Sequence, residues 1–117
     1  MSYDLRISVK PQGAPDDCYV QIAEPEYKNP TYNLGQMFRA CMNWDFKQRE
    51  YYPCADVIHY VEHGICQLRF NSKAYEKYNP ENGWGSLSGA LNTLESLREC
   101  IYQTAENVPI ECMYMAW

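Results

Sequence analysis

Apolar and polar residues alternate near both ends of the chain, which is the pattern of β-strands. Residues 3–10 alternate cleanly and predict a strand with one buried and one solvated face. After a loop at residues 11–17, the segment with Cys18, Val20 and Ile22 on one face predicts a second strand, paired with the first as an antiparallel hairpin. Residues 110–117 are apolar on both faces, which is typical of a strand that pairs centrally or is covered on both sides. We expect this last strand to join the hairpin.

Three segments between these strands have the 3.6-residue periodicity of amphipathic helices. The first begins near Asn33, with Gln36 three residues later as in a capping box. The second covers Cys54–Phe70, where the apolar positions form one stripe. The third begins after Ser86, a good N-cap, and ends before Pro109.

The predicted order of elements is therefore β-β-α-α-α-β, which is an α+β layout. We expect a small, three-stranded, mostly antiparallel sheet with the helices packed on one face. Residues 43–52 are predicted as loop and residues 73–78 as one more helical turn. A chain of 117 residues is long enough for one core, so we expect a single α+β domain over residues 1–117.

Charge, cysteines and tyrosines narrow the class of protein. The formal net charge of −5 argues against non-specific binding to nucleic-acid phosphates as the function. The chain lacks the pattern of a secretory signal and has no apolar run of the ~20 residues that a membrane span needs. We therefore expect a cytoplasmic protein without a membrane segment, whose six cysteines are free thiols. The eleven tyrosines suit a protein interface, although tyrosine also fills small cores.

Residues 78–86 (YNPENGWGS) are the most distinctive stretch of the sequence. Pro80 ends the preceding helical turn, and positive φ is expected at Asn82 or Gly83. Trp84, held between two glycines, either packs against the final helix or is an exposed recognition residue, and we favour packing. An anion at the N-terminus of the final helix is a weaker alternative, because the stretch contains no lysine or arginine.

An aromatic surface around the same loop is the second candidate feature. Tyr51, Tyr52, Tyr75, Tyr78 and Trp84 can gather there, either as an interface or as packing over the helix ends. The candidate binding residues are Tyr78, Asn82, Trp84, Ser86, Tyr51 and Tyr52.

A third feature has the spacing of a metal site. His59, Glu62 and His63 match the H-x-x-E-H motif of inverted zinc peptidases, and Cys66 lies on the same helix face. That face is opposite the apolar stripe and should be solvated, whereas a peptidase would bury its ligands in a cleft. We therefore expect no metal, no other cofactor and no catalytic residue, and keep a metal-dependent enzyme as an alternative.

The Tyr-x-Pro-x-Asn-Gly-Trp-Gly stretch at residues 78–85 and the helix after it resemble a family of small, mostly uncharacterised proteins. Phages, prophages and other mobile elements of gut bacteria encode them. The resemblance covers about residues 34–107, and its specific part is the stretch itself. It implies no catalytic residue. It implies an accessory protein that binds a host or phage protein, or an inhibitor of bacterial defence that acts like an anti-CRISPR or by sequestering nucleotides. The expected function is a non-enzymatic protein-binding module, with the oligomeric state left open.

Overall fold

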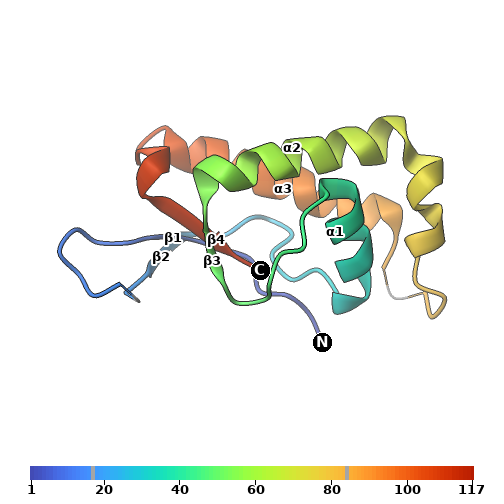
Figure 1. Cartoon of the computed structure of the whole chain (residues 1–117), viewed down its shortest axis with the longest axis horizontal. Coiled ribbons are helices and arrows are strands. Elements are labelled where there is room, and N and C mark those ends of the chain that lie inside the picture. Colours follow the sequence, from blue (N-terminus) through green and yellow to red (C-terminus); the bar gives the residue numbers. More distant parts are fainter. Residues whose placement is uncertain (17, 84) are drawn as a thin grey trace.

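The computed structural model describes residues 1–16, 18–83 and 85–117, so Asp17 and Trp84 lie outside the described residues. Figure 1 shows α2 and α3 side by side along the longest dimension, with the strands near one end of the pair and α1 near the other. The strands are β1 (Arg6–Val9), β2 (Val20–Ala23), β3 (Tyr51–Pro53) and β4 (Met113–Ala116). The α-helices are α1 (Gly35–Met42), α2 (Cys54–Phe70) and α3 (Leu87–Ala105), and shorter 3-10 helices are η1 (Tyr32–Leu34), η2 (Ser72–Tyr78) and η3 (Ile110–Cys112).

The sheet has four antiparallel strands in the order β2-β1-β4-β3, so the prediction of an α+β fold is confirmed and the number of strands was wrong. The missed strand, β3, lies in the segment predicted as loop. This strand has only three residues, the last of which is Pro53. It is therefore too short to show an alternation of apolar and polar residues. β4 pairs with β1 on one side and β3 on the other, which confirms the central position that its two apolar faces predicted.

One face of the sheet packs against the helices. Ile7 is paired with Met115, and both side chains are fully buried. The apolar face predicted for the second strand was wrong, because Val20 is 47% and Ile22 is 42% exposed. β2 is an edge strand, and its pairing with β1 is irregular beside Ile7. The apolar side chains of β2 therefore do not add to the buried core.

The helix predictions are mostly confirmed. α2 has the predicted bounds, and the Oγ of Ser86 caps α3 by accepting a hydrogen bond from the N–H of Gly89 at 3.1 Å. The cap predicted at Asn33 was wrong. A 3-10 turn precedes α1, so the cap moves back to Thr31, whose hydroxyl accepts a hydrogen bond from the N–H of Asn33 at 3.3 Å.

The core continues from the sheet into an aromatic cluster around Trp117, which is 2% exposed. Its ring stacks on Phe46, with ring centres 4.2 Å apart, and lies 5.3 Å from the ring of Phe38. All six cysteines are free thiols, as predicted. None of the described helices has the length and apolar character that a bilayer span needs.

Candidate functional site

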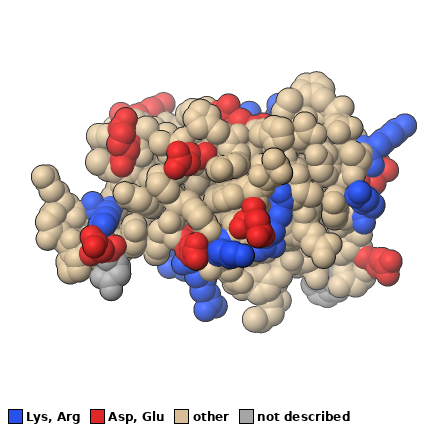
Figure 2. Space-filling view, viewed as in Figure 1, with Lys and Arg blue, Asp and Glu red and all other residues tan. Residues whose placement is uncertain are grey.

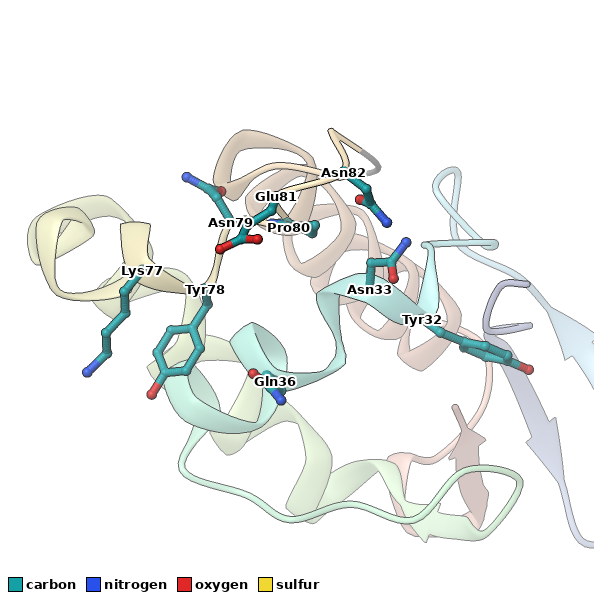
Figure 3. A pocket seen from close by; sticks show the side chains of 9 residues that line it. All are labelled: Tyr32, Asn33, Gln36, Lys77, Tyr78, Asn79, Pro80, Glu81 and Asn82. Atoms are coloured by element: carbon teal, nitrogen blue, oxygen red, sulfur yellow. The ribbon is translucent and has the colours of Figure 1, made fainter.

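A pocket of about 530 Å³ opens between the start of α1 and the loop that joins η2 to α3. We call it the amide pocket, because carboxamide side chains approach it from both sides (Figure 3). Two of the predicted binding residues, Tyr78 and Asn82, belong to its lining. The lining residues are Tyr32, Asn33, Gln36, Lys77, Tyr78, Asn79, Pro80, Glu81 and Asn82.

The loop reaches the start of α1 because of its glycines. Gly83 has a φ of 75°, which confirms the positive φ predicted in this turn. Gly85 has a φ of 114°, and a Cβ there would lie only 3.0 Å from side-chain carbons of Thr31 and Leu34. Any larger residue at position 85 would push the loop away from η1. The two halves of the amide pocket are thus held together by a close backbone approach.

The N-terminus of α3 is occupied by groups of the chain itself. The Oδ1 of Asn79 accepts a hydrogen bond from the N–H of Leu87 at 2.9 Å, and the Oγ of Ser86 accepts one from the N–H of Gly89. A phosphate would need such N–H groups to be free. This arrangement disfavours the anion alternative and explains Ser86 as a helix cap.

Carboxamide and tyrosine side chains make up most of the lining of the amide pocket. Asn33 and Gln36 each offer a donor and an acceptor, and Figure 3 shows both side chains on the α1 side of the pocket. The Nζ of Lys77 lies 5.3 Å from the centre of the Tyr78 ring. Among the described lining residues, Lys77 and Glu81 carry the charge, and none is histidine, cysteine or serine. The described lining therefore does not contain the pairing of a serine or cysteine with a histidine that activates many nucleophiles.

Tyr75, the other described aromatic candidate near this pocket, serves packing. The hydroxyl of Tyr75 donates a hydrogen bond to the Oε1 of Gln67 at 3.0 Å, and its ring lies 6.3 Å from that of Tyr78. Burial raises the pKa of the Tyr75 hydroxyl. The prediction for Trp84 lies outside the described residues.

The structure does not bring Tyr51 and Tyr52 to the amide pocket. Both lie in β3, where neighbouring residues point to opposite faces of the sheet. Tyr51 stacks on Tyr19, with ring centres 3.9 Å apart, on the face away from the helices. Tyr52 points to the other face and lies 4.8 Å from the ring of Trp44. One aromatic surface that unites these tyrosines with Tyr78 is therefore not formed.

The histidine motif does not assemble a metal site within the described part of the chain. His59, His63 and Cys66 are all exposed on α2. Glu62 accepts a hydrogen bond from the hydroxyl of Tyr102 in α3. No group of three or more His, Cys, Asp or Glu side chains that could hold a metal ion is found among the described residues.

Sequence reasoning missed the α1 side of the amide pocket. Asn33 and Gln36 were considered only for the start of a helix, and Tyr32 was not singled out. Nothing in their spacing links these residues to residues 78–82. Comparisons with known proteins give no further assignment, because no family model, curated protein or solved structure matches the chain.

Proposed function

We propose that this protein is a non-enzymatic binding module that holds a segment of another polypeptide in the amide pocket. The observation that carries this proposal is the placement of Asn33 and Gln36 opposite Tyr78 and the loop at residues 79–82, around about 530 Å³. A carboxamide can pair with both the N–H and the C=O of a peptide backbone, and tyrosine contributes contact area at low entropic cost.

The distribution of charge supports a polypeptide rather than a nucleic acid as the partner. Figure 2 shows acidic and basic side chains interspersed over one face. Several basic side chains are paired, such as Arg69 with Glu95 at 2.9 Å and Lys28 with Glu24 at 2.8 Å. A surface that binds phosphates would instead gather unpaired basic residues.

One observation favours a second candidate function, the sequestering of a nucleotide. Lys77 and Tyr78 place a cation beside an aromatic ring in the same pocket, which can pair with a phosphate and stack on a base. The occupied N-terminus of α3 makes this the weaker candidate. The origin of the chain in a phage or other mobile element stays a prediction.

The decisive experiment compares Gln36→Ala with the matched control Gln103→Ala, which removes another exposed glutamine from a helix. Wild type and both variants are used to capture proteins from a bacterial lysate, and the captured proteins are quantified. We expect at least one protein to be retained by the wild type and Gln103→Ala and to be depleted about tenfold with Gln36→Ala, as for a central contact of an interface. That protein is then purified and its Kd for each variant is measured.

The proposal is wrong if no captured protein depends on Gln36. A thermal-shift screen with nucleotides on the same three proteins tests the second candidate. A nucleotide that raises the Tm of the wild type and of Gln103→Ala, but not of Gln36→Ala, would replace the polypeptide as the ligand of this pocket.

A further inference from the structure

A second pocket, of about 300 Å³, lies where the start of α2 meets β3 and the segment after α1. We call it the aromatic pocket. Its α2 side is one helical stripe, made by Asp56, Val57 and Tyr60 at helix spacing, and Pro53 at the end of β3 precedes this stripe. The full lining is Trp44, Tyr52, Pro53, Asp56, Val57, His59 and Tyr60.

The rings of this pocket are held in fixed positions. Trp44 stacks on Tyr60 with ring centres 4.7 Å apart and meets Tyr52 nearly edge to face at 4.8 Å. The hydroxyl of Tyr52 accepts a hydrogen bond from the N–H of Lys47 at 2.7 Å and donates one to the Oε2 of Glu50 at 3.0 Å. Because the rings are already in place, a ligand would bind without ordering them.

The charge of the lining is negative. Asp56 is an exposed carboxylate in the first turn of α2, and none of the lining residues is lysine or arginine. The basic side chain of Arg39, near Trp44 in sequence, is committed elsewhere, since it donates a hydrogen bond to the C=O of Phe46 and lies 3.6 Å from Asp45. The pocket thus combines aromatic rings with a carboxylate, and its lining contains no lysine or arginine; His59 lies three residues after Asp56 on α2.

We propose that the aromatic pocket binds the guanidinium group of an arginine side chain from a partner polypeptide. A guanidinium stacks on an aromatic face and donates two parallel hydrogen bonds to one carboxylate. Tyr60, which is 38% exposed, offers the ring face that its stacking on Trp44 leaves uncovered, and Asp56 offers the carboxylate. Recognition of the guanidinium stands independently of the amide pocket. Only the polypeptide nature of the partner rests on the proposed function.

Two other interpretations of the same residues make different predictions. In the first interpretation, Asp56 binds no ligand and serves only as a favourable charge near the partially positive N-terminus of α2. The pocket can also accept any apolar side chain, in which case the charge of the ligand does not matter. Both interpretations are tested by ligands that differ in charge and not in shape.

The experiment is an NMR titration that follows the indole N–H of Trp44, assigned with a Trp44→Phe variant. The probes are N-acetyl-arginine methylamide and N-acetyl-citrulline methylamide, which have nearly the same shape and differ in charge. The protein variants are Asp56→Asn and the control Glu76→Gln, which neutralises an exposed carboxylate of η2 outside the lining.

We expect the arginine probe to shift the Trp44 resonance and to bind about fivefold more tightly than the citrulline probe, the size expected for one partly exposed cation–π contact with an ion pair. Asp56→Asn should remove this preference, and Glu76→Gln should keep it within about twofold. Equal binding of the two probes by the wild type, absence of any shift at Trp44, or an equal loss in both variants would overturn the proposal. The comparison of probes on the wild type needs no variant to fold, and its outcome does not depend on Gln36.

Discussion

Gly64 lies in the middle of α2, where a glycine normally weakens a helix, and the structure gives it a packing role. A Cβ at this position would lie 2.7 Å from the Cγ of Met42, 3.0 Å from a methyl carbon of Leu94 and 3.3 Å from the Sγ of Cys41. These three side chains come from α1 and α3 and are at most 1% exposed. The glycine therefore lets both helices approach α2 closely.

The Gly64→Ala substitution sets two effects of opposite sign against each other. Alanine gains about 1 kcal/mol over glycine in a helix interior. An extra carbon in a packed core costs about 1–3 kcal/mol. Met42 is flexible and can relieve part of the closest contact, but Leu94 and Cys41 leave little room on the other side. The packing cost should therefore lie in the upper half of its range, about 2–3 kcal/mol, which leaves a net loss of stability of about 1–2 kcal/mol.

Gly89→Ala is the matched control, since it makes the same substitution in the first turn of α3. A Cβ there meets only the Oγ of Ser86 at 3.4 Å, which is an ordinary contact. We expect this variant to gain about 0.5 kcal/mol. Because both variants change the unfolded chain alike, the difference between them measures packing in the folded state.

The assay is urea unfolding and, in parallel, thermal unfolding, both followed by circular dichroism at equal protein concentration for the wild type and both variants. The Tm should fall by about 4 °C per kcal/mol lost for a chain of this size. The packing argument would be refuted by a Gly64→Ala variant at least as stable as the wild type, or by two variants of equal stability.

Three further predictions concern the core, the thiols and a helix cap. Trp117→Ala should lose about 3–5 kcal/mol of unfolding free energy in denaturant melts, whereas truncation of Tyr27, which is 49% exposed, should change it by less than about 1 kcal/mol. Burial raises the pKa of the Cys41 and Cys54 thiols to about 12, so a thiol reagent at neutral pH should leave both unmodified until unfolding, when all six react. Because these thiols titrate near 9.0 when unfolded, stability should fall as the pH rises from 9 toward 12, and this fall should become shallower in the double alanine variant of these two cysteines. Ser86→Ala should cost about 1 kcal/mol in the same melts, and no change would mean that the cap is not formed in solution.

The fold could be predicted from the sequence where one physical signal acts over many residues. α2 has 17 residues, so its apolar stripe repeats often enough to fix both ends. β3 has three residues, one of them Pro53, and forms because its backbone pairs with the edge of β4. A strand that exists only through its partner leaves no periodic trace in its own sequence.

The same limit explains what was missed at the candidate sites. Tyr51 and Tyr52 were grouped because they are adjacent in a segment predicted as loop, but in β3 adjacency separates them onto opposite faces. Tyr78 and Asn82 do line a pocket, yet its other half comes from Asn33 and Gln36, more than forty positions earlier. Pockets of this kind depend on which loops meet across the core, and hydrophobic patterning constrains the core rather than the loops.

The two pockets lie at opposite ends of α1, since Gln36 belongs to its first turn and Trp44 lies two residues beyond its last residue. An α-helix of eight residues is about 12 Å long, a distance that about four residues of extended peptide cover. One partner segment that fills both pockets would therefore carry its arginine about four or five residues from the part held by the carboxamides. A double-mutant cycle with Gln36→Ala and Asp56→Asn against the captured partner tests this. Losses in both single variants that add in the double variant would show one partner in two separate pockets. A loss confined to Gln36→Ala would show that the partner leaves the aromatic pocket empty.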